Sequence, residues 1–524
     1  MERQPPSIFN DVIGPVMRGP SSSHTAAAVR IGRLARQLVR GKLKRVTAEF
    51  DPNGSLATTY HGQGSDMGLV GGLLGYSPED ERLPHSLDIA RQEGMEVTFD
   101  VVEYGASHPN TYRLKLFSDL GEQISASAIS TGGGMIIYES IGGFPVTIAG
   151  DFFETLVFCT DSLTSGEVEK FLRQNVSLEY VDQSCNEAAT LVVVKTAAPV
   201  AHEIIALLSE MSGVTKVLCL SPVLPVLSSK DVRVPFLSSQ AMLHHCDADL
   251  SLYEMALLYE SARGHISEEE VFAKMQAIVL LMQDSIRGGL AGTDYQDRIL
   301  GRHSHLIAEG VEQGRAIPGD VLNRVISYIT ALMEVKSSMG VIVAAPTAGS
   351  CGALPGTIIG VCAALGLPVE DATKAMLAAG MVGVFIAEHA TFAAEVGGCQ
   401  VECGAGSSMA AAGLVNLMNG TAKQAIDAAS MALQNVMGMI CDPVGDRVEV
   451  PCLGKNVMAG ANAIACATMA LSGFDKVIPF DETIESMYQV GQQLPPQLRC
   501  TGNGGLSITP TGKRIHAYLL SSEG

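Results

Sequence analysis

The chain has 524 residues, of which 47% are hydrophobic and 17% are charged, and its formal net charge is −20 at pH 7. An acidic surface repels nucleic acids and anionic lipids, so neither a nucleic acid nor a membrane is an expected partner. The length predicts about two to four domains. The hydrophobic excess predicts large buried surfaces, including the interface of a homodimer or larger homo-oligomer.

The first residues, MERQPPSIFNDV, lack the apolar core of a secretory signal, so we expect a cytoplasmic protein. The stretch 340–369 carries no charged residue and is long enough to span a bilayer. It also contains three prolines and several glycines, and amphipathic stretches flank it. We therefore predict a loop followed by a buried helix rather than a membrane span.

Residues 1–150 mix helical and strand patterns and predict an α/β domain. The sequence HTAAAVRIGRLARQLVRG predicts an amphipathic helix, with Val29, Leu34 and Leu38 inward. The arginines of the same helix are expected to point outward: Arg30, Arg33 and Arg40. Period-two patterns predict strands in VTAEFD, MEVTFDVV and TYRLKLFS.

The sequence GPSSSHT, from Gly19 to Thr25, precedes that helix. Its hydroxyls and the free N–H groups of a helix start attract a carboxylate or a phosphate. His24 is expected in the first turn, where the helix dipole lowers the pKa of an imidazole and favours a neutral base. The alternative is a plain serine N-cap with an exposed histidine.

Residues 154–222 predict the order βαββαβ of a ferredoxin-like unit. This unit resembles an ACT domain, a module that often binds free amino acids. The turn after its first strand reads TDSLTSG and lacks the proline of an ACT ligand loop. We therefore favour a structural or dimerising role for it.

Residues 223–250 predict a linker, and residues 251–524 predict an all-α domain with several alanine-rich helices. Asp320 is the expected N-cap of one helix. The sequence HHCDAD, from His244 to Asp249, contains ligand-type residues, but a helix N-cap by Asp247 or Asp249 is the favoured interpretation.

The chain contains 12 cysteines, which without a secretory signal do not predict disulfides. Four lie in apolar runs and are expected in the core: Cys159, Cys219, Cys362 and Cys466. Cys399, Cys441 and Cys452 lie in GGCQVECG and ICDPVGDRVEVPC. They are either further core thiols or three ligands of an iron–sulfur cluster that leaves one iron open, and their spacing alone does not decide.

Two loops of small residues, PTAGSCG (346–352) and TGNGGLSITPTG (501–512), can bring backbone amides against a ligand. The alternative is a pair of tight turns between packed helices. Neither loop places a lysine as a Walker A loop does, so nucleotide binding is not expected.

Five segments together resemble the iron–sulfur-dependent L-serine dehydratases (L-serine ammonia-lyases), in a single-chain form. They are GPSSSHT, APTAGSCG, GCQVECG, CDPVGDRVEVPC with Asn456 after it, and GGLSITPTG. The resemblance covers nearly the whole chain. It implies a beta-type domain at 1–150, an ACT-like insert at 154–222 and a catalytic alpha domain at 251–524, and thus a multidomain α+β fold.

The resemblance implies deamination of L-serine to pyruvate and ammonium without pyridoxal phosphate. It implies a [4Fe–4S] cluster on Cys399, Cys441 and Cys452, whose open iron acts as a Lewis acid on the β-hydroxyl. His24 is then the first candidate for the base that takes the Cα proton. The expected substrate-binding residues are Ser21, Ser22, Ser23, Thr25, Thr347, Gly349 and Ser350.

Several positions depart from the family pattern. Gln63 stands where a histidine is usual, with His61 nearby, and Gln63 cannot carry a proton. His389 replaces an asparagine, Cys500 replaces a glutamate, and Gly454-Lys455 replaces a charged pair. We expect these changes to face the substrate.

The departures leave two alternatives open. A sister lyase would act on another β-substituted amino acid, such as L-threonine, L-cysteine or a 3-hydroxy acidic amino acid, although L-serine is favoured. A non-catalytic regulator would sense amino acids through the ACT-like unit, with its cluster closed by Cys351, Cys403 or Cys500. Cys500 is also a candidate cap for the open iron of a resting enzyme.

Overall fold

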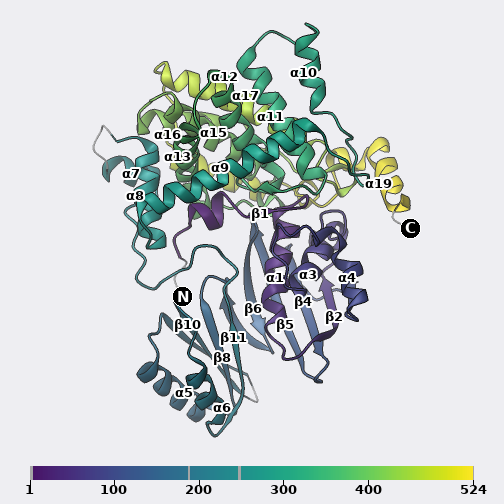
Figure 1. Cartoon of the computed structure of the whole chain (residues 1–524), viewed down its shortest axis with the longest axis vertical. Helices are drawn as coiled ribbons and strands as arrows, with labels where there is room; N and C mark the ends of the chain where they lie inside the picture. Colours follow the sequence, from purple (N-terminus) through teal and green to yellow (C-terminus); the bar gives the residue numbers. More distant parts are fainter. Residues whose placement is uncertain (1–3, 187–188, 246–249, 523–524) are drawn as a thin grey trace.

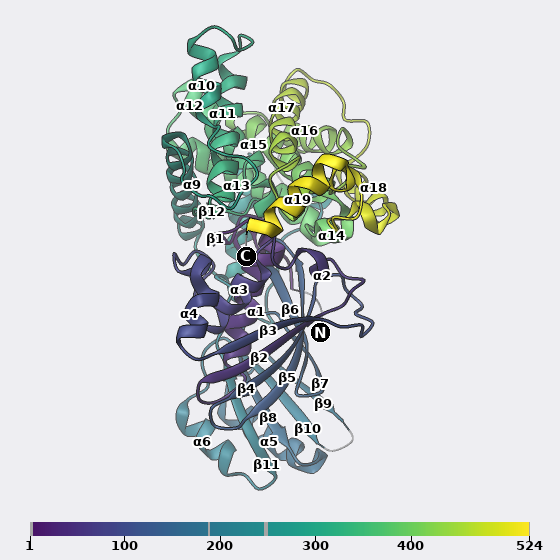
Figure 2. The ribbon, with the colours of Figure 1, turned by 90° about the vertical axis from the view of Figure 1, so that its right-hand side faces the viewer.

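The computed structural model describes residues 4–186, 189–245 and 250–522. It is a mixed α+β structure, with two sheets at one end and a large helical part at the other (Figures 1 and 2). This confirms the predicted fold class. The domain boundaries themselves stay predictions.

A six-stranded sheet dominates residues 43–148, in the order β3-β2-β4-β5-β6-β7. Its pairs are antiparallel except β2 with β3, which are parallel. Helices α1, α3 and α4 cover one face (Figure 1). The elements are α1 (Ala27–Arg36), β2 (Leu43–Phe50), α2 (Leu56–Thr59), α3 (Ser65–Leu73), η3 (Leu83–His85), α4 (Ser86–Gln92), β3 (Glu96–Val101), β4 (Thr111–Ser118), β5 (Gln123–Gly132), β6 (Met135–Ile141) and β7 (Phe144–Ile148).

Helix α1 has the predicted apolar face, but one of its arginines points inward. Val29, Leu34 and Leu38 are buried as expected. Arg30 was expected in solvent, yet it is 2% exposed and donates from Nη1 to the carbonyl of Gly134 at 2.6 Å. The tight turn before β6 offers that carbonyl, and a long side chain can reach it across the face of the sheet.

The middle part has a four-stranded sheet in the order β11-β8-β10-β9, as in a ferredoxin-like unit. Helices α5 and α6 pack on one face, and the other face joins the core of the six-stranded sheet through Leu156, Leu191 and Val193. Cys219 was expected in the core but is exposed, because it lies on the edge strand β11. The elements are β8 (Phe153–Cys159), α5 (Ser162–Asn175), β9 (Tyr180–Cys185), β10 (Thr190–Thr196), α6 (His202–Glu210) and β11 (Val214–Leu220).

The helical part is built around α13 and α15, which are buried among their neighbours. The elements are α7 (Ser239–His245), α8 (Leu252–Gly264), α9 (Glu268–Ala291), α10 (His305–Glu312), α11 (Asp320–Ser337), β12 (Ile342–Val343), η4 (Ala348–Ser350), α12 (Ala353–Leu365), α13 (Val369–His389), α14 (Ala394–Gly397), η5 (Cys399–Val401), α15 (Cys403–Leu417), α16 (Ala422–Gln434), η6 (Val444–Asp446), α17 (Cys452–Leu471), α18 (Phe480–Gln493), η7 (Pro496–Leu498), η8 (Gly505–Ile508) and α19 (Pro510–Ser522).

Two expected helix caps differ from the structure. Helix α11 begins at Asp320, so the N-cap is Gly319 rather than Asp320. Helix α8 is capped by Ser251, whose hydroxyl donates to Glu254 at 2.6 Å. The alternative caps Asp247 and Asp249 lie outside the described residues.

The stretch Ala348–Leu365 is long and apolar enough to cross a membrane, but 83% of it is buried inside the protein. It forms η4 and α12, which agrees with the predicted loop and buried helix.

The first segment of the chain packs with the helical part rather than with the six-stranded sheet. Helix η1 (Ile8–Val12) contributes Ile8 and Val12 to the helical core, and β1 (Val16–Met17) pairs with β12. The buried carboxyl group of Glu260 accepts from the backbone N–H of Ile8 at 2.8 Å. The chain therefore crosses from the helical part to the sheets just before the GPSSSHT motif.

Candidate active site

The histidine of GPSSSHT is held by hydrogen bonds on both sides of its ring. Helix η2 (Ser22–Ala26) is a turn of π-helix before α1, and His24 in it is completely buried. Its Nδ1 lies 3.2 Å from Ser21 Oγ and 3.4 Å from Glu395 Oε1, and its Nε2 lies 2.9 Å from Thr59 Oγ1. Burial lowers the pKa of His24 to about 3, so the ring is neutral; the cause is desolvation rather than the expected helix dipole.

The hydrogen-bond directions around Thr59 set the tautomer of His24. Thr59 Oγ1 donates its single proton to the carbonyl of Ser55 at 2.7 Å, so toward His24 it can only accept. Nε2 of His24 therefore carries the proton, and Nδ1 holds the free lone pair. That lone pair faces Ser21 and Glu395.

The other hydroxyls of the motif connect the sheets with the helical part. Ser22 Oγ accepts from the backbone N–H of Ala348 at 3.2 Å, in the loop PTAGSCG. Thr25 Oγ1 donates to the carbonyl of Gln63 at 2.8 Å, and Ser23 is buried. Thus GPSSSHT and PTAGSCG lie against each other, and Thr25 has committed its proton to the backbone.

The backbone of the loop PTAGSCG is hydrogen-bonded by its own side chains and by Asn456. Thr347 and Ser350 form a capping box around η4. Asn456 Oδ1 accepts from the backbone N–H of Ala353 at 2.8 Å, and its Nδ2 donates to the carbonyls of Gly349 and Cys452, each at 2.8 Å. One buried amide thus ties this loop to the start of α17.

The three predicted cysteines come from separate segments to one buried region. Cys399 lies in η5, Cys441 follows α16 in sequence, and Cys452 begins α17; all three are buried. A hydrogen bond with Cys403 lowers the pKa of Cys399 to about 7. Burial raises the pKa of Cys452 to about 12, partly offset by the charge of Lys336.

Two further cysteines lie beside this set. Cys403 is hydrogen-bonded to Cys399, and Cys500 is hydrogen-bonded to Cys441. Cys500 also donates from its backbone N–H to the carbonyl of Cys441 at 2.9 Å. Cys351 differs, because its thiol faces Met333 Sδ at 3.9 Å in the hydrophobic core.

Comparison with known proteins identifies the family of the chain. The family model of the serine dehydratase alpha chain matches residues 247–507, and that of the beta chain matches residues 10–84. The probable L-serine dehydratase alpha chain of Bacillus subtilis is 38% identical over 254 residues, which cover 48% of this chain and 85% of that one. The chain belongs to the serine dehydratase family. These are ammonia-lyases that work without pyridoxal phosphate, so the protein is an enzyme.

Two more relatives show how the family parts are joined here. The probable beta chain of the Bacillus subtilis serine dehydratase is 41% identical over 155 residues, covering 30% of this chain and 69% of that one. The L-serine dehydratase of Haemophilus influenzae is 26% identical over 507 residues and covers 94% of this chain and 96% of its own. This family member thus carries alpha and beta parts in one chain.

The positions that depart from the serine dehydratase pattern do not all lie together. Gln63 is buried and donates from Nε2 to Cys500 Sγ at 3.4 Å, so these two departures form one contact. His389 was expected to face the substrate, but it is exposed at the end of α13 and pairs with the carbonyl of Leu237 at 2.9 Å. His61 is also exposed and lies 2.5 Å from Asp66, so its ring does not take the place of the usual histidine.

Lys455 places a cation beside the cysteines of this family member. Its Nζ donates to the carbonyl of Ile440 at 2.7 Å and to Asp442 Oδ1 at 2.9 Å. Among the neighbours that raise its pKa are Cys399 and Cys441. The departure Gly454-Lys455 therefore adds positive charge to the site.

Two glutamates of the site were missed by sequence reasoning: Glu395, which is buried, and Glu402, which is half-buried. Glu395 contacts His24, and burial raises the pKa of Glu395. Glu402 lies so close to Gly349 that a Cβ there would meet its carboxyl oxygens at 3.1 and 3.2 Å. Burial also raises the pKa of Glu402 well above its ordinary value, helped by the charges of Cys399 and Glu395. The sequence EVGGCQVE, with an acid on each side of Cys399, was the available signal.

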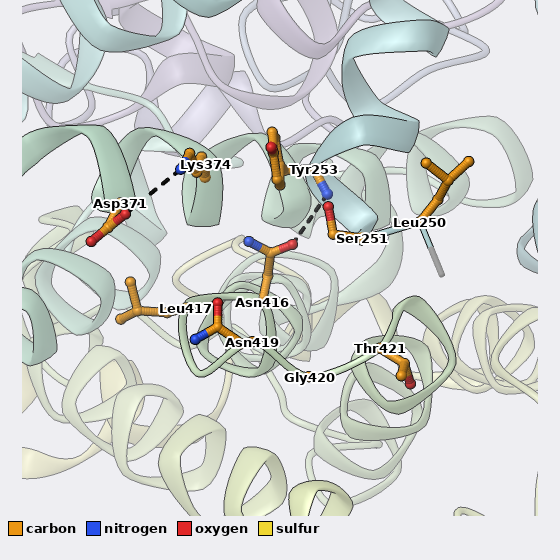
Figure 3. A pocket seen from close by; sticks show the side chains of 10 residues that line it. All are labelled: Leu250, Ser251, Tyr253, Asp371, Lys374, Asn416, Leu417, Asn419, Gly420 and Thr421. Atoms are coloured by element: carbon orange, nitrogen blue, oxygen red, sulfur yellow. Dashed lines mark hydrogen bonds and ion pairs between the residues drawn. The ribbon is translucent and has the colours of Figure 1, made fainter. Parts of the chain in front are cut away.

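A cavity of about 390 Å³ on the helical part lies apart from these residues (Figure 3). Its wall includes Tyr253, Lys374 and Asn416, and Asn416 accepts from the backbone N–H of Tyr253 at 3.2 Å. None of the predicted site residues lines it.

Proposed function

We propose that the enzyme deaminates L-serine to pyruvate and ammonium with a [4Fe–4S] cluster bound to Cys399, Cys441 and Cys452. The observation that carries this proposal is that the buried Cys399 interacts electrostatically with both Cys441 and Cys452, while Glu395, four residues before Cys399, contacts the neutral His24. The names of the relatives, which are L-serine dehydratases, support the choice of substrate.

The donor set suits an iron–sulfur cluster. Thiolate sulfurs are the usual ligands of these clusters, and an anionic cluster benefits from nearby cations, here Lys336 and Lys455. Within the described part of the chain, no group of three or more His, Cys, Asp or Glu side chains is placed to hold a single metal ion. A cube of iron and sulfide is wider than one ion, so its ligand sulfurs lie farther apart.

When bound by three ligands, such a cluster supplies a Lewis-acidic iron that assists the departure of the β-hydroxyl. The remaining work falls to the side chains. His24 Nδ1 holds the free lone pair of a neutral imidazole and takes the Cα proton. Glu395, 3.4 Å from Nδ1, lies where it interacts with the resulting imidazolium.

The carboxylate of the substrate is held where the two loops meet. The hydroxyl of Ser22 can donate to it, because Ser22 Oγ accepts from the Ala348 N–H and keeps its own proton, whereas the hydroxyl of Ser21 faces Nδ1 of His24. Ser23, Thr347, Gly349 and Ser350 shape this end of the site, and Thr25 positions the chain at Gln63. Loss of the Cα proton and the hydroxyl leaves an enamine, which tautomerises and hydrolyses to pyruvate and ammonium.

The contact between Gln63 and Cys500 bears on the choice of substrate. Gln63 uses its amide N–H toward Cys500 Sγ, and the backbone of Cys500 is held by Ser55 Oγ at 2.9 Å and by Cys441. The two departures from the family pattern, Gln63 and Cys500, therefore contact each other, so each side chain fits the other's replacement. L-serine remains the proposed substrate, ahead of L-threonine and L-cysteine.

The test is an anaerobic assay for 2-oxo acid and ammonium with L-serine, L-threonine and L-cysteine. We expect L-serine to give the highest kcat/KM. His24→Ala should lower kcat by about 10²–10⁴-fold, the usual contribution of a general base, and leave the visible spectrum unchanged. A protein inert toward L-serine, or a His24→Ala variant with unaltered turnover, contradicts the proposal.

A further inference from the structure

A second cavity, of about 590 Å³, lies where the sheets and the helical part meet. Its wall combines residues of the N-terminal segment, of β5 and β6, of the middle part and of the segment that follows α13. It contains neither His24 nor any of the cysteines. The cavity is thus a separate site, although its wall at Phe392 and Val396 is continuous in sequence with Glu395 and Cys399.

A buried lysine of β10 points its ammonium group toward this region. Lys195 is 1% exposed, and its Nζ donates to the carbonyl of Thr147 at 2.6 Å and lies 3.3 Å from Glu154 Oε1. An ammonium group has three N–H donors, so one remains for a ligand. Both Lys195 and Thr147 line the cavity.

Buried acceptors in the same region have no hydrogen-bond partner within the described residues. Asp151, which lines the cavity, is 7% exposed and its Oδ1 is unpartnered. Gln4 Oε1, also in the wall, is unpartnered too. The carboxyl group of Glu154 lies beside the ammonium group of Lys195, and burial raises the pKa of Glu154 to about 8. Buried oxygens left this way are satisfied by a donor from a ligand or a water.

The rest of the wall is mostly hydrophobic. The apolar side chains that face the cavity include Met135, Ile136, Ile137, Phe152, Leu224 and Phe392, and the charged Asp11 and Arg263 also line it. A cavity of this kind, with a few converging polar groups on an apolar lining, is typical of a small-molecule site.

We propose that this cavity binds a small ligand that carries an ammonium group on an apolar body. The carboxylate of Asp151 accepts from the ligand ammonium, and the apolar body packs against Ile136 and Phe392. The remaining N–H of Lys195 is available to a ligand carboxylate, so an apolar amino acid has one contact more than the corresponding amine. The proposal does not depend on the reaction at the cysteines.

Isothermal titration calorimetry on the full-length, anaerobically purified protein tests the proposal with three matched probes. They are L-leucine, 3-methylbutylamine (the same body without the carboxylate) and 4-methylpentanoate (the same body without the ammonium). We expect saturable binding of the two ammonium compounds and none of 4-methylpentanoate. Tighter binding of L-leucine identifies an amino-acid site, and equal binding identifies an amine site.

Variants locate the binding. Asp151→Asn should weaken the binding of both ammonium compounds by at least about tenfold, because it removes the negative charge that pairs with the ligand ammonium. Ala390→Phe places a large side chain in the cavity from the end of α13 and should abolish the binding of both compounds. Asp88→Asn, at an exposed site, is the control, and the melting temperature of each variant reports its folding. Binding of 4-methylpentanoate as tight as that of L-leucine, unchanged binding in folded Asp151→Asn, or no binding of any probe at millimolar concentration overturns the proposal.

Discussion

Burial determines the protonation state of His24. Its neighbours fix the ring from both sides, and its low pKa keeps Nδ1 available as a base at every physiological pH. Sequence patterns placed His24 at the start of a helix but gave no measure of its burial. Burial came from packing between two parts of the chain that are more than three hundred residues apart in sequence, at Glu395.

The low pKa of His24 predicts a specific pH dependence of stability. The pKa falls from 6.5 to about 3 on folding, so the unfolded chain binds more protons between these values. Stability due to this group is complete above pH 6.5 and is lost as the pH falls toward 3. Between pH 7 and pH 5 the native protein should lose about 2 kcal/mol more than His24→Asn.

Denaturant midpoints at the two pH values measure this difference. His389→Asn is the matched control, because His389 is exposed, and it should follow the native protein. Parallel pH profiles for the native protein and His24→Asn would show that the ring is not held neutral.

The sequence predicted the positions of some individual residues correctly and of others incorrectly. The cysteines and the two loops could be proposed as parts of the site because they lie in distinctive short motifs. Arg30 and Cys219 were misplaced, because a period-three or period-two pattern does not reveal which carbonyl an arginine can reach or which strand lies at an edge. Glu395 and Glu402 were missed because acidic residues are common. What distinguishes them is tertiary: Glu395 is buried, and Glu402 lies against Gly349.

At the scale of elements, the small residues of the loop PTAGSCG allow its backbone to approach neighbouring side chains closely. Gly349 lies against the carboxyl group of Glu402. Gly349→Ala would place a Cβ at 3.1 Å from Glu402 Oε1 and force the loop or the acid to move. We expect kcat/KM for L-serine to fall at least about tenfold, since small displacements of positioning groups are costly. Gly454→Ala is the control, because a Cβ there has no atom within 4 Å. Equal activity of the two variants would show that this loop does not shape the site.

Asn456 joins two elements through its amide. Its side chain satisfies the N–H of Ala353 and the carbonyls of Gly349 and Cys452, all of them buried. Asn456→Ala leaves these groups without partners, so the free energy of unfolding should fall by about 2–3 kcal/mol. Asn462 lies in the same helix but is half-buried, so Asn462→Ala should lower the free energy of unfolding by less. Denaturant unfolding of both variants provides the comparison, and equal losses would contradict the structural role of Asn456.

Strands and helices were largely predictable because their patterns are local. The βαββαβ order, β4 at Thr111–Ser118 and the alanine-rich helices follow from periodicity. The strands β5, β6 and β7 were not predicted, and neither was the π-helical turn η2, which places His24 one turn before α1. Such local distortions are stabilised by tertiary contacts, here Ser22 with Ala348 and His24 with Thr59.

At the scale of the whole molecule, the site is assembled from both ends of the chain. Sheets and helices meet where Ser22 contacts Ala348, His24 contacts Glu395 and Gln63 contacts Cys500 (Figure 2). The first segment of the chain packs in the helical core, so the two parts are tied together by the chain itself as well as by contacts. Because the residues of the candidate site come from distant segments, motifs along nearly the whole chain were needed to indicate the class of enzyme. Composition alone indicated only that nucleic acids and membranes are not expected partners.

The most direct test of the account measures iron and acid-labile sulfide in anaerobically purified protein and in two cysteine variants. Cys441→Ser removes a proposed ligand, whereas Cys466→Ser changes an equally buried thiol whose neighbours are Asn435 and Asn462. We expect about four irons and four sulfides per chain in the native protein and in Cys466→Ser. In Cys441→Ser we expect loss of the cluster and of L-serine deamination. A native protein that is folded and active without iron, or a Cys441→Ser variant with full iron content and activity, would show that these cysteines hold no catalytic cluster.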